Sequence, residues 1–142
     1  ETGNAGHIGH VIVEPNGRRC TCGGRGCLEA EASGPAIEAI TGRSPTQPTY
    51  EIMVRTGRLV GRGVASACNL LDLKLVVVGG SVALGFGATF FNAAQRTLDE
   101  LCTIEFSRKA RIVPTRLSDE GPLIGASAVG WRGLNRMATV RD

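Results

Sequence analysis

Long hydrophobic runs are absent from this chain of 142 residues, and no apolar stretch approaches the roughly 20 residues needed to cross a bilayer. The chain also lacks an initial methionine and a charged segment followed by an apolar one, so we expect no signal peptide and a cytoplasmic location. Its net charge is only +3 and its basic residues are scattered, which argues against nucleic-acid binding by this segment. With 42% hydrophobic and 20% charged residues, the remaining class is an ordinary globular domain with one core.

Strand-like and helix-like patterns alternate along the chain, which favours an α/β domain with helices packed on a sheet. The β-branched segment 73–78 predicts a strand covered on both faces, because parallel strands are buried in this way. Apolar positions spaced by three, four and seven residues predict a helix over 50–71, whose glycines Gly57, Gly61 and Gly63 would permit close packing. The other expected elements are strands over 11–13 and 111–117, a short helical piece from Cys27, a helix from the Ser33 cap to Gly42, a helix after 79–81 and a last helix that begins near Pro122.

A histidine and three cysteines form the most informative cluster: His10, Cys20, Cys22 and Cys27 lie within eighteen residues. Three thiolates and one imidazole complete a tetrahedral Zn²⁺ site and leave no open position for water, so such a metal would be structural. The intervening glycines are turn formers, which a backbone wrapped around one ion requires. Metal binding would also order a loop that is too polar to bury itself.

The same cysteines have a simpler interpretation as unrelated residues, or as a disulfide pair with spare thiols. Cys-x-Cys is poorly placed to pair with itself, and three cysteines cannot pair evenly, so the metal site is favoured. The remaining two, Cys68 and Cys102, sit in apolar helical patterns and are expected to be buried thiols rather than a bridge.

Three stretches carry a resemblance to a known family. They are Gly3 to Gly34, which includes Gly6-His7-Ile8-Gly9-His10 and Cys20-Thr21-Cys22-Gly23-Gly24-Arg25-Gly26-Cys27-Leu28-Glu29; Val76-Val77-Val78-Gly79-Gly80-Ser81; and Asp119-Glu120-Gly121-Pro122-Leu123-Ile124-Gly125-Ala126. Together they resemble the ROK family of bacterial sugar kinases and sugar-responsive repressors, and among these the glucokinase-like sugar kinases most closely. The first stretch resembles the zinc-binding signature of that family.

The resemblance implies an actin-like ATPase (ribonuclease H-like) fold, with a zinc loop over residues 7–29 and a nucleotide-side α/β part over about 50–134. It also implies that Glu29, which directly follows Gly-Cys-Leu, binds sugar hydroxyls together with His10. The zinc would act indirectly, by fixing the loop that presents these side chains to the sugar. Without the resemblance, Glu29 would be a solvent-facing residue at a helix start, worth a few tenths of a kcal/mol from the helix dipole.

His7 departs from the family pattern, in which this position is usually a sugar-binding glutamate. An imidazole can donate or accept through one nitrogen at a time, whereas a carboxylate accepts from two hydroxyls. His7 therefore either holds a sugar hydroxyl, marks a change of ligand or loss of catalysis, or is a loop imidazole without a ligand.

Gly79-Gly80-Ser81 connects a predicted strand to a predicted helix. Such a turn lets backbone amides approach a nucleotide at the carboxyl end of a sheet, although a tight turn with no ligand has the same appearance. Beside the zinc motif, it resembles the adenosine-binding turn of the family, with Ser81 in place of the usual third glycine.

The chain contains no Asp-Gly-Thr phosphate loop and no aspartate in the context of a catalytic base. We therefore expect residues 1–142 to be the carboxy-terminal half of a longer ATP- and Mg²⁺-dependent hexose kinase, a homodimer or tetramer, and to be inactive alone. The alternative is the ligand-binding half of a sugar-responsive regulator without kinase activity. A phosphate loop upstream would identify the kinase, and a basic helix-turn-helix would identify the regulator.

Overall fold

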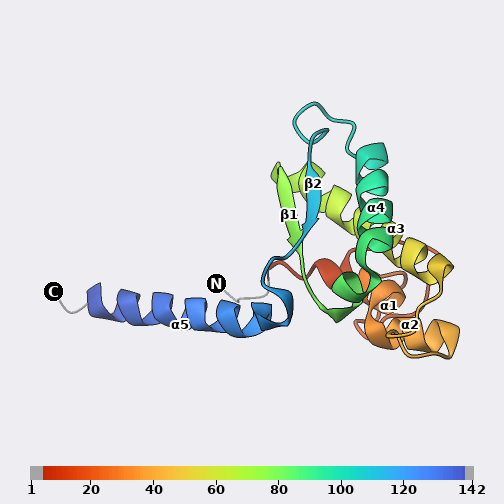
Figure 1. Ribbon diagram of the computed structural model, residues 1–142. Helices are drawn as coiled ribbons and strands as arrows, with labels where there is room; N and C mark the ends of the chain where they lie inside the picture. The colour runs from red at the N-terminus through yellow and green to blue at the C-terminus, as the bar shows by residue number, and fades with distance from the viewer. Residues whose placement is uncertain (1–4, 140–142) are drawn as a thin grey trace.

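A computed structural model describes residues 5–139 of the chain (Figure 1). The elements in order are η1 (Ile8–His10), α1 (Leu28–Ala32), α2 (Gly34–Thr41), α3 (Tyr50–Leu71), β1 (Leu75–Val78), α4 (Ser81–Leu101), β2 (Arg111–Pro114), η2 (Ser118–Glu120) and α5 (Gly121–Thr139). Within these residues, no helix has both the length and the apolar character that a membrane span requires. Gly3 and Asn4, which begin the zinc-type signature, lie outside the described residues.

The long helices α3 and α4 pack against each other and against one face of a small parallel sheet, in which β1 pairs with β2 (Figure 1). Leu75 pairs with Arg111 and Val78 with Pro114. The main core lies between the helices and the sheet and contains Val64, Ala65, Cys68, Ala94, Leu98, Cys102, Ala110 and Ile112. This core holds the carboxyl end of β1, and therefore the turn into α4, in a fixed position.

The helix boundaries follow from capping residues. The Ser33 hydroxyl accepts the N–H of Ala36 at 3.2 Å at the start of α2, and Gly42 ends that helix with a φ of 67°. Thr49 caps α3 in the same way, and Asp72 closes it in the left-handed conformation. The helices predicted over Ser33 to Gly42 and 50–71 are therefore confirmed.

The close packing expected of the α3 glycines is also confirmed. A Cβ added at Gly57 would lie 2.4 Å from the carbonyl oxygen of Phe90, and one at Gly61 would lie 2.6 Å from that of Ala94. Only glycine lets the α4 backbone come this close to α3.

Of the three predicted strands, one does not form and two are present but shorter than expected. Residues 11–13 form no strand but a single antiparallel bridge from Ile12 to Cys27, because this segment turns back into the cysteine loop instead of pairing along its length. The strand expected over 111–117 ends at Pro114, because its partner β1 ends at Val78 and turns away at Gly79 and Gly80. The strand expected over 73–78 begins at Leu75 and is covered on one face only, because α3 and α4 lie on the same side of the sheet.

The last helix begins at Gly121, close to the expected start near Pro122. It extends away from the other elements (Figure 1), and its apolar residues Leu123, Ile124, Val129 and Trp131 are exposed. The apolar positions of α5 therefore do not contribute to the core formed by α3, α4 and the sheet.

Candidate functional site

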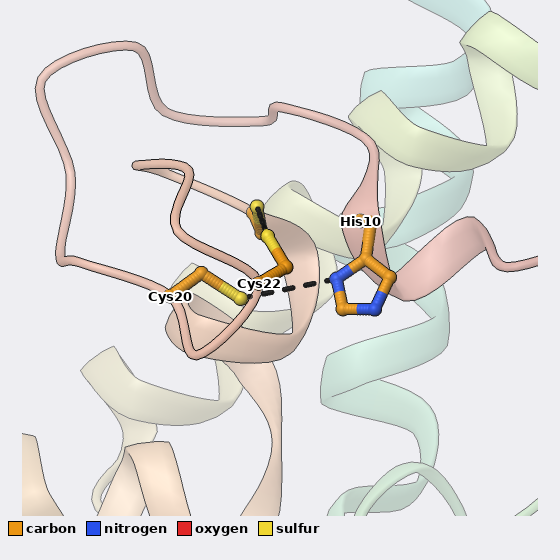
Figure 2. A group of neighbouring side chains, drawn as sticks. His10, Cys20 and Cys22 are labelled. Carbon is orange, nitrogen blue, oxygen red and sulfur yellow. Dashed lines mark hydrogen bonds between the residues drawn. The ribbon is translucent and has the colours of Figure 1, made fainter.

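The four predicted metal ligands meet in one cluster. The ligand atoms of His10, Cys20, Cys22 and Cys27 all lie within 4.8 Å of one another. The Cys20 sulfur is 3.8 Å from His10 Nδ1, and the sulfurs of Cys22 and Cys27 are 3.7 Å apart. Figure 2 shows the His10 ring and the Cys20 sulfur directed toward each other. A tetrahedron with zinc–sulfur bonds of about 2.3 Å has sulfur–sulfur edges of about 3.8 Å, so this donor set fits a zinc ion.

The backbone around the cluster is a compact hairpin over residues 13–26, closed at its base by the N–H of Val13, which donates to the carbonyl oxygen of Gly26 at 2.9 Å. The N–H of Cys20 donates to Gly24 at 2.9 Å, and the N–H of Gly26 donates to Arg18 at 2.8 Å. Gly26 has a φ of 72°, and a Cβ there would lie 1.7 Å from the carbonyl oxygen of Glu14. No other residue fits at Gly26, and the turn it makes carries the chain into Cys27, the N-cap of α1.

Two thiols of the cluster differ in their tendency to ionise. Hydrogen bonding from the Cys22 backbone is the largest of the effects that lower the pKa of Cys20 to about 7. Burial is the main cause that raises the pKa of Cys27 to about 12. A cation in the centre of the cluster would favour the thiolate at both positions.

An open cavity of about 400 Å³ is lined by residues close in sequence to members of the His/Cys cluster, including Gly9, Leu28 and Glu29. Its wall includes Gly9 and Glu29 from the amino-terminal part of the chain and Gly79, Gly80 and Ser81 from the turn between β1 and α4. Residues about fifty positions apart in the sequence therefore share one cavity, whose size is typical of small-molecule sites. Glu29 is exposed, and its Oε2 would be 3.4 Å from a Cβ added at Gly9.

The turn from β1 into α4 requires a glycine. Gly80 is the N-cap of α4 and has a φ of 101° and a ψ of 152°, a conformation that is essentially restricted to glycine. Gly80 offers no side-chain cap, so the first N–H groups of α4 remain available at the cavity.

The ring of His7 stacks on the ring of His10, a member of the His/Cys cluster. The rings of His7 and His10 are 6.0 Å apart at their centroids and 11° from parallel. Gly9 and Glu29 line the cavity, whereas His7 and His10 are not among its lining residues. Both histidines are exposed, His7 as the N-cap of η1 and His10 as its last residue.

Sequence reasoning gave no functional role to several residues that the fold brings to this region. Ser33, Thr56 and Phe90 line the cavity, and Thr56 Oγ1 is buried without a hydrogen-bond partner among the described residues. Nothing in the sequence around a threonine within a helix indicates that it will line a cavity. Cys68 and Cys102 are free and buried in the main core, as predicted, and lie apart from the site.

The sequence profile of the ROK family matches residues 1–131. The chain belongs to the ROK family. The family membership predicted from the zinc-type signature and the glycine turn is therefore confirmed.

A ROK relative named N-acetylmannosamine kinase, from Haemophilus influenzae (strain PittEE), is 35% identical in an alignment 140 positions long, and the match covers 88% of this chain and 45% of the relative. The chain thus spans about half the length of the curated relatives it matches.

Solved ROK structures share the fold. A ROK hexokinase from Thermus thermophilus is 30% identical with a TM-score of 0.67, covering 87% of this chain and 48% of that one. A ROK glucokinase from Streptomyces griseus, in complex with glucose and AMPPNP, has a TM-score of 0.71 at 23% identity and covers 88% of this chain and 51% of that one. A ROK transcriptional regulator, a homologue of the E. coli MLC protein, has a TM-score of 0.66 at 23% identity and covers 79% of this chain and 35% of that one. Family and structural similarity together imply the actin-like ATPase fold.

Proposed function

We propose that this chain is the carboxy-terminal, sugar- and nucleotide-binding part of an ATP-dependent ROK sugar kinase. The observation that carries the proposal is the single cavity shared by Glu29 and the Gly79-Gly80-Ser81 turn. A phosphoryl transfer enzyme must hold the acceptor hydroxyl next to the nucleotide, since most of its catalysis comes from positioning. In this arrangement, Glu29 binds sugar hydroxyls and the glycine turn approaches the adenosine of ATP.

Zinc has a structural role in this proposal. His10, Cys20, Cys22 and Cys27 would hold the ion, and their compact geometry supports that assignment. The ion would add no reaction step but would order the hairpin that leads directly into α1 and Glu29. His10 would connect the metal to the sugar side, with His7 beside it.

The substrate in this proposal is a hexose or a hexose derivative. The names of the similar proteins support this class, since they include an N-acetylmannosamine kinase and a hexokinase. The complete enzyme would use ATP and Mg²⁺ in the cytoplasm as a homodimer or tetramer. Residues 1–142 alone would be inactive, because they contain no Asp-Gly-Thr phosphate loop.

Glu29→Gln tests the assignment of the sugar site in the full-length kinase. A charge-assisted hydrogen bond to a hydroxyl contributes on the order of 1.5–3 kcal/mol, so sugar affinity should fall roughly ten- to hundredfold while the affinity for an ATP analogue stays the same. Calorimetric titration with glucose, N-acetylmannosamine and the analogue measures both. Glu38→Gln, on the exposed face of α2, is the matched control. Sugar affinities within twofold of wild type in Glu29→Gln would reject the role of Glu29.

A sugar-responsive regulator is the second candidate. The fold similarity to a ROK transcriptional regulator and the histidine at position 7 favour it. A kinase would phosphorylate a hexose with ATP, whereas a regulator would bind the sugar without turnover and change its affinity for DNA. Assays of the full-length protein for sugar phosphorylation and for sugar-dependent DNA binding distinguish the two.

A further inference from the structure

Glu31 is a buried acidic residue next to the metal cluster that the proposed function does not use. It lies in α1, is 1% exposed, and its backbone N–H donates to the carbonyl oxygen of Cys27 at 3.2 Å. Its neighbour Glu29 faces the cavity, so the two carboxylates of α1 have different surroundings. A buried carboxylate is costly unless charged or polar groups surround it, so the contacts of Glu31 require an explanation.

Arg55 on α3 supplies the opposite charge. One guanidinium nitrogen pairs with Oε2 of Glu31, and the other donates to the Glu31 carbonyl oxygen at 2.7 Å. The planar guanidinium group thus binds both the side chain and the backbone of Glu31, which fixes the carboxylate in one orientation. Since Arg55 comes from a long helix that belongs to the main core, this carboxylate is anchored to the rigid part of the molecule.

The other oxygen of Glu31 reaches the hairpin that carries the metal ligands. The backbone N–H of Arg18 donates to Oε1 at 2.5 Å, two residues before Cys20. A Cβ added at Gly17 would lie 2.2 Å from the same oxygen, so the hairpin comes as close as glycine permits. Glu31 therefore joins the segment just before Cys20 to the helix just after Cys27.

Few other contacts attach the hairpin to the helices. Between Glu14 and Arg19 no residue is buried, and polar contacts replace a hydrophobic core. Arg25 binds the carbonyl oxygen of Gly17, but both residues belong to the hairpin itself. Arg62 fixes the hairpin at its start by binding the Val13 carbonyl oxygen and Glu14. Glu31 is the contact that connects the segment next to Cys20 with the helices.

From these contacts, we infer that Glu31 is a positioning residue of the metal centre and that Arg55 holds its carboxylate in place. The inference rests on the proposed zinc site. Glu31 touches no metal ligand side chain; it fixes the hairpin so that Cys20 and Cys22 are already near Cys27 and His10 when the metal arrives. A ligand set arranged in advance loses less conformational freedom on binding, which strengthens affinity.

The test is the Zn²⁺ affinity of the 142-residue chain, measured by competition with a chromophoric chelator well below the unfolding temperature of each variant. Glu31→Gln should weaken Zn²⁺ binding about tenfold or more, as removal of an outer contact of a metal site generally does. Arg55→Lys should weaken it less, because lysine keeps the charge but loses the two-pronged geometry. Glu38→Gln and Arg58→Lys are exposed controls that should bind like wild type.

A double variant separates positioning from stability. Replacing the pair with Glu31→Met and Arg55→Met should restore much of the thermal stability lost in the single variants, because well-packed apolar residues often replace a buried ion pair without loss. Zn²⁺ affinity should nevertheless stay about tenfold or more below wild type, because methionine offers the Arg18 N–H no oxygen acceptor. If the variants lose thermal stability but bind Zn²⁺ within twofold of wild type, Glu31 is a structural residue only and the inference is wrong. A wild-type chain that binds no Zn²⁺ would instead reject the metal site itself, and the inference with it.

Discussion

Cys20 and Cys27 show how two thiols of one cluster can differ in charge. With a pKa lowered to about 7, Cys20 is mostly a thiolate at pH 8, whereas Cys27, with a pKa raised to about 12, still carries its proton. A zinc ion needs both as thiolates. A zinc ion in the proposed site would therefore displace the proton of Cys27 and, below pH 7, a further proton from Cys20.

Zinc binding should consequently release protons and weaken as the pH falls. Each displaced proton costs about tenfold in affinity per pH unit, so we expect at least that slope between pH 9 and 7 and a steeper one below pH 7. Calorimetric titrations in buffers of different ionisation enthalpy count the protons. Cys68→Ala, which removes a core thiol outside the cluster, should leave the count unchanged. A zinc affinity independent of pH between 7 and 9 would contradict the assignment of Cys27 as a protonated ligand.

At the scale of elements, the contact between α3 and α4 depends on glycine. Ordinarily, alanine in place of a helical glycine stabilises a protein by about 0.5–1 kcal/mol. At Gly61 the added methyl group would lie 2.6 Å from the Ala94 carbonyl oxygen and 2.8 Å from the Thr97 Cβ, so the two helices would have to separate. The steric cost should exceed the gain in helix propensity.

Gly61→Ala should therefore lower the free energy of unfolding by about 1–2 kcal/mol, within the range for overpacked cores. Gly85→Ala in α4 provides a control with the opposite sign, because a Cβ there meets no atom within 4 Å and should stabilise the helix slightly. Denaturant unfolding of both variants measures the difference. Equal stability of the two variants would show that the helices are not in the close contact described.

At the scale of the whole molecule, the parallel sheet has one uncovered face. Leu75 and Val77 point to that face and are 58% and 57% exposed, while Val76 and Val78 pack on the core. Parallel sheets are normally covered on both sides, and exposed apolar surface tends to become an interface.

The 142-residue chain should therefore self-associate as its concentration rises. Sedimentation velocity across a concentration series would detect the association. The double substitution Leu75→Thr and Val77→Thr should shift the chain toward the monomer, because threonine keeps the strand preference and removes apolar surface. A wild-type chain that stays monomeric up to its solubility limit would contradict this role of the sheet face.

The parts of this protein that sequence reasoning recovered are local. His10 and the three cysteines lie within eighteen residues, so their spacing alone keeps them close together in space. The α2 and α3 boundaries follow from Ser33, Gly42 and Thr49, whose capping chemistry acts over three or four residues. The strand predicted over residues 11–13 does not form, because an apolar triplet becomes a strand only where another segment pairs along its length. Here Ile12 pairs with the single residue Cys27.

The sequence by itself determined the family, the residues of the His/Cys cluster and the glycine turn, because each depends on residue types at short, fixed spacing. The tertiary structure decided that Glu29 and Gly79-Gly80-Ser81 share a cavity, that Glu31 meets Arg55 twenty-four positions away, and that only one face of β1 is buried. These features arise from how α1, α3 and the sheet pack together. Packing of distant segments follows from the burial of the whole chain, and no short stretch of residues contains that information.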